Sequence, residues 1–122
     1  MTINFTHNEN IKGIYFSISQ SSETEPAKLK ALIQGLEATE TKFRNLKINL
    51  SLSNLVKRII VVKGKKEKSF VSNLYQYYED WKAFFVKQQD AIVFDLSMFN
   101  NSYEILDTLV HELGHAVHVK FI

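Results

Sequence analysis

Two histidines one helical turn apart, His111 and His115, flank a glutamate near the end of the 122-residue sequence. In a helix, side chains at positions i and i+4 share a face, so both imidazoles can reach one metal ion about 2 Å away. Such pairs suit Zn²⁺, and because the sequence contains no cysteine, any zinc must be held by nitrogen and oxygen ligands. Glu112 lies about 100° further round, where it can take a proton from a metal-activated water without displacing a ligand. The spacing therefore predicts a hydrolytic zinc half-site.

A helix from about Ser102 to His118 must position these groups, and Asn101 with Glu104 resembles the capping pair that would start it. One side of this predicted helix is apolar and comprises Ile105, Leu106, Leu109, Val110, Leu113, Ala116 and Val117. The opposite arc comprises Glu104, Asp107, Thr108, His111, Glu112, His115 and His118. We therefore expect one face in the core and the chemistry on the other.

Two further residues of this helix suggest supporting roles. Asp107, one turn before His111, is placed either to orient that histidine through a hydrogen bond or to complement the positive amino end of the helix. Gly114 costs about 1 kcal/mol relative to alanine in a helix interior. We therefore expect a neighbouring strand to approach the helix closely at Gly114.

The rest of the chain alternates between helical and extended patterns. Apolar spacing predicts helices over 26–46 and 69–86, although the aromatic residues of the second also suit a twisted strand. Alternation and β-branched runs predict strands over 11–19, 47–52, 58–62 and 90–96. The last strand would carry Ala91, Val93 and Asp95 on one face, and its shortness and charge are typical of an edge strand. These elements predict an α+β fold with a small mixed sheet and a C-terminal helix.

Composition narrows the possible partners. The 15 basic and 13 acidic residues leave a net charge of +2, too small to indicate a nucleic acid or an anionic membrane. The polar first ten residues resemble no signal peptide, and no apolar run approaches the ~18 residues of a membrane span. We expect a soluble, cytoplasmic single domain over 1–122, with a partly mobile start over 1–20.

The run from Leu109 to Val117 resembles the active-site helix of zincin-like metallopeptidases, and the likeness extends over Asp90 to Val119. It implies a zincin-like fold, with His111 and His115 as zinc ligands and Glu112 as the base and proton shuttle. It also implies an edge strand along which a peptide or protein substrate pairs, here at Ala91, Val93 and Asp95. A metzincin would have glycine in place of His118 and a histidine in place of Phe121, so the chain does not resemble that subgroup.

The third ligand is not evident from the sequence. His118 faces the same way as His111, but three ligands from one straight helix would spread over about 10 Å of its axis. Upstream side chains are the second possibility, namely His7, Glu79, Asp80 and Asp95. A longer natural chain is the third, and a shortened domain that has lost hydrolysis is the fourth.

The sequence is compatible with two main functions and with a third that has less support. The first is a zinc-dependent metallopeptidase in which Glu112 activates the attacking water. The second is a non-catalytic binding module on the same scaffold, such as a phage or mobile-element protein that acts on a host protein. The third is a structural metal site that fastens the last helix.

Overall fold

The computed structural model describes residues 5–11, 13–47, 51–71, 81–86 and 89–121. Five strands form one mixed sheet in the order β1-β2-β3-β5-β4. The strands are β1 (Phe5–Ile11), β2 (Ile14–Ser19), β3 (Arg58–Val62), β4 (Ala83–Val86) and β5 (Ala91–Asp95). The α-helices are α1 (Pro26–Asn45), α2 (Leu52–Leu55), α3 (Lys65–Val71) and α5 (Ser102–Phe121). Two 3-10 turns are η1 (Gln20–Thr24) and η3 (Leu96–Met98).

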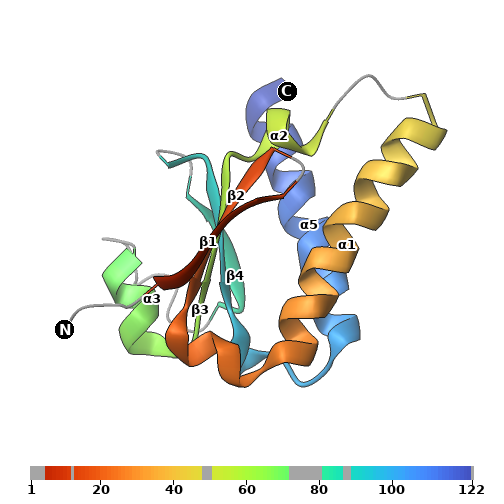
Figure 1. Ribbon diagram of the computed structural model, residues 1–122. Coiled ribbons are helices and arrows are strands. Elements are labelled where there is room, and N and C mark those ends of the chain that lie inside the picture. Colours follow the sequence, from red (N-terminus) through yellow and green to blue (C-terminus); the bar gives the residue numbers. More distant parts are fainter. Residues whose placement is uncertain (1–4, 12, 48–50, 72–80, 87–88, 122) are drawn as a thin grey trace.

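The sheet has a parallel centre and antiparallel margins. β2, β3 and β5 run parallel, whereas β1 pairs antiparallel with β2 and β4 pairs antiparallel with β5. Figure 1 shows α1 and α5 together on one side of the sheet and α3 on the other. The expected α+β fold with a small mixed sheet and a C-terminal helix is therefore confirmed.

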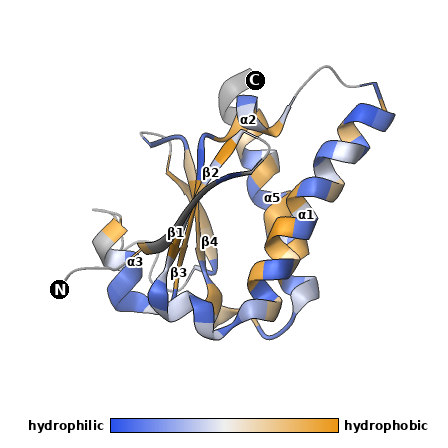
Figure 2. Cartoon of the chain, viewed as in Figure 1, coloured by the Kyte–Doolittle hydropathy of each residue, from blue (hydrophilic) through white to orange (hydrophobic). Residues whose placement is uncertain are grey.

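The main core fills the space between the sheet and the pair α1 and α5. Figure 2 shows apolar residues, in orange, along β2, β3 and β4 and on the facing sides of α1 and α5. The buried side chains there include Ile59, Val61, Ile92, Phe94, Leu32, Leu36, Ile105 and Leu109. At Gly35 of α1 an added Cβ would lie 2.5 Å from Cδ2 of Leu106, so the missing side chain lets α1 approach α5 closely. This packing fixes the position of α5, the helix that carries the predicted zinc half-site.

Five predicted elements are confirmed, namely the helices over 26–46 and 102–118 and the strands over 11–19, 58–62 and 90–96, the first of these as β2 from Ile14. The cap of α5 is also confirmed, because Asn101 Oδ1 accepts a hydrogen bond of 3.0 Å from the backbone N–H of Glu104. None of the described helices is both long and apolar enough to cross a membrane.

The prediction that residues 90–96 form an edge strand is wrong. β5 lies between β3 and β4, and all of its residues, from Ala91 to Asp95, are buried. The charge that suggested an edge belongs to Asp95, which is compensated inside the protein by Lys68. Among the described strands, β4 forms this edge of the sheet instead.

Two other predictions need correction. The predicted helix 69–86 ends in the strand β4 rather than in helix, and its start coincides with the end of α3, while 72–80 lies outside the described residues. In the predicted strand 47–52, Leu52 instead opens α2, and 48–50 lie outside the described residues. Within the segment 1–20, Phe5–Ile11 form β1 and so extend the sheet by one strand.

Candidate metal centre

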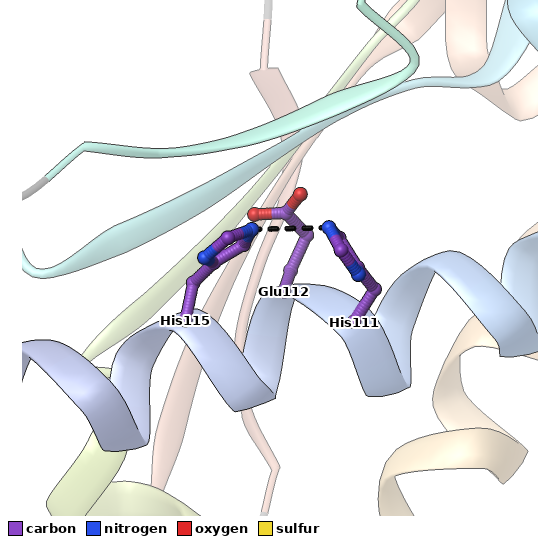
Figure 3. Close-up of side chains that lie close together, drawn as sticks. All are labelled: His111, Glu112 and His115. Atoms are coloured by element: carbon purple, nitrogen blue, oxygen red, sulfur yellow. Dashed lines mark hydrogen bonds between the residues drawn. The ribbon is translucent and has the colours of Figure 1, made fainter.

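The two motif histidines converge in space. His111 and His115 project from α5 on the side that faces the sheet edge carrying β4 (Figure 3). Their Nε2 atoms lie 3.0 Å apart, and the two rings stand edge to face at 88°. Because both atoms are hydrogen-bonding nitrogens, one ring donates and the other accepts, according to the tautomer. The helix alone therefore brings two metal-ligating nitrogens to one point.

The spacing of the Nε2 atoms can be compared with that of a tetrahedral zinc site. Two nitrogens about 2.0–2.1 Å from such an ion lie about 3.3–3.4 Å apart. The observed 3.0 Å is shorter by only a few tenths of an ångström, which small rotations of the His111 and His115 rings can supply. Both rings are exposed, so an ion can reach them from solvent. The donor set fits a divalent ion that prefers imidazole, as zinc does.

Glu112 differs from its neighbours because it is buried. Only 5% of the residue is exposed, although the sequence pattern placed it on the solvent-facing arc with the histidines. Burial raises the pKa of Glu112 from its ordinary value of 4.5 to about 7. One oxygen of its carboxyl group and the histidine nitrogens all lie within 4.8 Å of one another. The arrangement therefore combines an open metal-binding position with a carboxyl group that holds its proton unusually tightly.

The remaining candidates on α5 do not join this cluster. Within the described part of the chain, the metal-binding group contains His111, Glu112 and His115 but not His118. His118 is exposed further along the helix. Asp107 is also exposed, and among the described residues no hydrogen bond joins it to either motif histidine.

Gly114 does not have the role that the sequence suggested. Nothing lies within 4 Å of the position that its Cβ would occupy, and the residue is exposed. The predicted close approach of a strand is therefore wrong. The sheet instead faces the side of α5 on which Leu109 and Leu113 are buried.

The upstream candidates for a third ligand are separated by topology. His7 belongs to β1, which is the opposite edge of the sheet from β4. Asp95 is buried in an ion pair with Lys68, whose Nζ lies 2.9 Å from Asp95 Oδ2. Glu79 and Asp80 lie outside the described residues.

Sequence reasoning missed two contributors to the surroundings of the site. The first is β4, whose aromatic run was assigned to a helix. The second is Lys68, which ends the charged run 63–68 of the sequence but has no exposed surface. Lys68 Nζ donates to the backbone carbonyl of Trp81 at 3.0 Å, at the start of the segment that becomes β4. The apolar neighbours Phe70 and Val71 were the only local sign that this charged run packs against the sheet.

Lys82 connects the start of β4 with α5. Its Nζ lies 3.1 Å from Glu104 Oε2 in the first turn of α5. Glu104 also accepts a hydrogen bond from the backbone N–H of Asn100, and these contacts lower its pKa below the ordinary value. The ion pair therefore joins the edge strand to the helix that carries the histidines.

Comparison with known proteins finds no relative of this chain. No protein-family profile matches the sequence, and neither the curated proteins nor the solved structures contain a significant match.

Proposed function

We propose that this protein is a zinc-dependent peptidase of the zincin type. The observation that carries the proposal is the convergence of the His111 and His115 Nε2 atoms, 3.0 Å apart, beside the buried carboxyl group of Glu112. Two imidazoles on one helical turn with a glutamate between them are the arrangement that hydrolytic zinc sites use. His111 and His115 would hold the ion.

The chemistry divides between the ion and the chain. When bound, zinc supplies the Lewis acidity that polarises a peptide carbonyl and makes a water molecule more acidic. Glu112 accepts the proton of that water and returns it to the departing amine. A pKa of about 7 suits a group that must both accept and donate a proton near neutral pH.

The edge strand β4 offers a place for an extended substrate. The backbone N–H of Asp95 donates to the carbonyl of Lys82 at 2.9 Å, so this pair is a hydrogen-bonded pair of the antiparallel ladder. Because such pairs alternate along a ladder, the N–H and C=O groups of Ala83 and Phe85 point away from β5. A peptide that pairs with Ala83 and Phe85 would take the role that the sequence assigned to Ala91, Val93 and Asp95.

The first test measures bound metal and peptide hydrolysis on the same samples. Purified protein should bind one zinc ion per chain, and His115→Ala should bind at least 100-fold more weakly. His118→Ala is the matched control, because this histidine is exposed on the same helix outside the cluster. We expect His118→Ala to keep full zinc binding, and a loss equal to that of His115→Ala would make His118 the third ligand.

The second test separates two roles for Glu112. As a general base, Glu112→Gln should keep zinc affinity but lower the kcat/KM for a fluorogenic peptide by about 10²–10⁴-fold. As a third ligand, the same variant should lose zinc affinity together with activity. Absence of zinc from the wild-type protein, or unchanged hydrolysis by Glu112→Gln, would contradict the peptidase proposal.

A non-catalytic binding module is the second candidate. It is favoured by the composition of the cluster, which among the described residues comprises two histidines and one carboxyl group, without a third histidine. In this case β4 would still pair with an extended segment of a partner, and zinc would be dispensable. Pull-down of a partner by His111→Ala/His115→Ala, as efficiently as by the wild type, would support this alternative over the peptidase.

A further inference from the structure

A second candidate site lies on the other face of the sheet. Ile59 and Val61 of β3 face α1 and α5, whereas the alternating residues Ile60 and Val62 belong to a separate apolar cluster on the α3 side. On that side, Ile60 and Val71 line a pocket of about 550 Å³. This volume is within the range of about 300–1,000 Å³ that is typical of small-molecule sites.

An arginine is held at this pocket by an aromatic ring. Arg58 of β3 is the direct cross-strand partner of Tyr15 of β2, and both line the pocket. The guanidinium carbon of Arg58 lies 5.3 Å from the centroid of the Tyr15 ring. This cation–π contact limits the motion of the long side chain and so orders its N–H groups before a ligand arrives.

Within the part of the chain that the structure describes, no carboxylate lies within ion-pair distance of the Arg58 guanidinium, so no acidic side chain there uses its N–H donors. An arginine presents a planar set of N–H donors that matches the two oxygens of a carboxylate. A lysine would supply only a point charge, so the residue type itself favours a flat, two-oxygen anion.

The remaining lining contains both polar and apolar side chains. Ser17, of which 5% is exposed, and Gln89 also line the pocket and add a hydroxyl and an amide. Phe5 joins the apolar wall. A few convergent polar groups on an apolar surface are the usual composition of a site for a small organic ligand.

We propose that this pocket binds a carboxylate carried by a flat apolar group, with Arg58 on the carboxylate and Tyr15 beside the apolar part. Such a ligand is either a free aromatic acid or the C-terminal residue of a peptide. The proposal does not depend on the metal centre, because the pocket lies on the side of Ile60, the sheet face turned away from α5.

The test is a titration followed by two-dimensional ¹H–¹⁵N NMR. Phenylacetate should shift the backbone signals around Arg58 and Ser17 and saturate with a Kd between about 10 µM and 1 mM, as expected for a ligand of this size. Phenylacetamide, which has the same shape without the charge, should bind at least 10-fold more weakly. The last titration uses N-acetyl-Gly-Phe with a free C-terminus, and the peptide with an amidated C-terminus is its uncharged control. Tighter binding of the free-terminus peptide than of phenylacetate would identify a peptide C-terminus as the ligand, and the reverse would identify a free aromatic acid.

Variants at the two arginines of the chain complete the test. Arg58→Met should weaken phenylacetate binding at least 10-fold, and Arg58→Lys should recover only part of it. Arg44→Met, at the exposed end of α1, should leave the affinity for phenylacetate unchanged. Since Arg58 is exposed, the variants should keep the wild-type melting temperature. Equal binding of phenylacetate by Arg58→Met, or no saturation by 10 mM, would overturn the proposal.

Discussion

Two buried carboxyl groups, Glu112 and Asp95, lie in opposite electrostatic surroundings. Glu112 is 5% exposed and Asp95 is 1% exposed, so both are removed from water to a similar degree. Burial raises the pKa of Glu112 to about 7. Burial acts in the same direction on Asp95, but hydrogen bonds from Gly64, Ser97 and Lys68 outweigh it and hold the pKa of Asp95 below its ordinary value of 3.8.

The difference lies in the partners rather than in the depth of burial. Asp95 Oδ1 accepts hydrogen bonds from the N–H of Gly64 at 2.9 Å and from the hydroxyl of Ser97 at 2.6 Å, and Oδ2 is paired with Lys68. Glu112 has two exposed imidazoles nearby instead. Partners of this kind stabilise the ionised form of a buried carboxyl group, whereas a carboxyl group without them costs stability when ionised and is available for chemistry.

Removing the lysine partner should have the largest effect. Lys68→Met leaves the Asp95 carboxylate buried without its counter-charge and should lower the free energy of unfolding by about 3–5 kcal/mol, measured in urea at pH 7. Lys68→Met/Asp95→Asn removes both charges and should recover part of this loss. A loss below about 1 kcal/mol in Lys68→Met would mean that Asp95 is hydrated in solution and that the contrast with Glu112 is not one of partners.

Neutralising Glu112 should change the free energy of unfolding in the opposite direction, that is, raise it. Because its folded pKa of about 7 exceeds the unfolded value near 4.5, the metal-free native state holds a proton that the unfolded state has lost between these pH values. Stability should therefore fall as pH rises through this window, by at most about 1.4 kcal/mol per pH unit, and level off above it. Glu112→Gln should lack this decrease and be more stable than the wild type at pH 8 by up to about 3 kcal/mol.

Urea denaturation from pH 4 to 8 checks this difference, and subtraction of the two curves cancels the histidine titrations that both proteins share. The exposed residue Glu37 provides a matched control, since Glu37→Gln should follow the wild-type curve. Parallel curves for wild type and Glu112→Gln would contradict this expectation, because they would show that the pKa of Glu112 is the same in the native and the unfolded state.

Zinc should make Glu112 behave more like Asp95. A divalent cation at His111 and His115 favours the ionised form of the neighbouring carboxyl group and lowers its pKa. Zinc at 100 times its Kd should add about 2.7 kcal/mol to the free energy of unfolding at pH 7.5 and reduce the fall in stability between pH 5 and 7. Removal of the ion with a chelator should restore the steeper curve. Identical pH curves with and without zinc would place any bound ion away from Glu112.

The same contrast explains what the sequence could predict. The histidine pair could be predicted because its spacing of four residues is local, and α5 could be predicted because its apolar residues repeat over four turns. The burial of Glu112 was not, since the residue lies about 100° from His111, at the boundary between the core and solvent. Whether a residue at this boundary is buried depends on how closely the sheet approaches the helix, and the local sequence pattern carries no information about that distance.

The position of β5 in the sheet depended on a contact between distant residues. Asp95 made the strand resemble an edge, and only the ion pair with Lys68, 27 positions earlier, lets that charge lie inside. The sequence did not predict β4 as a strand for a different reason. Ala83–Val86 is a run of four apolar residues, and periodicity cannot distinguish so short a strand from the end of a helix.

The smallest expected effect comes from one hydrogen bond of Asp95. Ser97 is exposed, but its hydroxyl donates to Asp95 Oδ1 at 2.6 Å, and hydrogen bonds to a charged group contribute more than neutral ones. Ser97→Ala should lower the free energy of unfolding at pH 7 by about 1 kcal/mol, which is less than the loss in Lys68→Met because Gly64 and the lysine still hold the carboxylate.

The effect should also depend on pH in the sense opposite to that of Glu112→Gln. The stabilisation from a carboxylate with a lowered pKa is present above its unfolded value near 3.8 and disappears as pH falls through the folded value. The gap between wild type and Ser97→Ala should therefore close as pH falls below the ordinary value of 3.8 and stay constant from pH 5 to 8. A gap that instead changes between pH 5 and 7 would mean that Ser97 acts through Glu112 or the histidines rather than through Asp95.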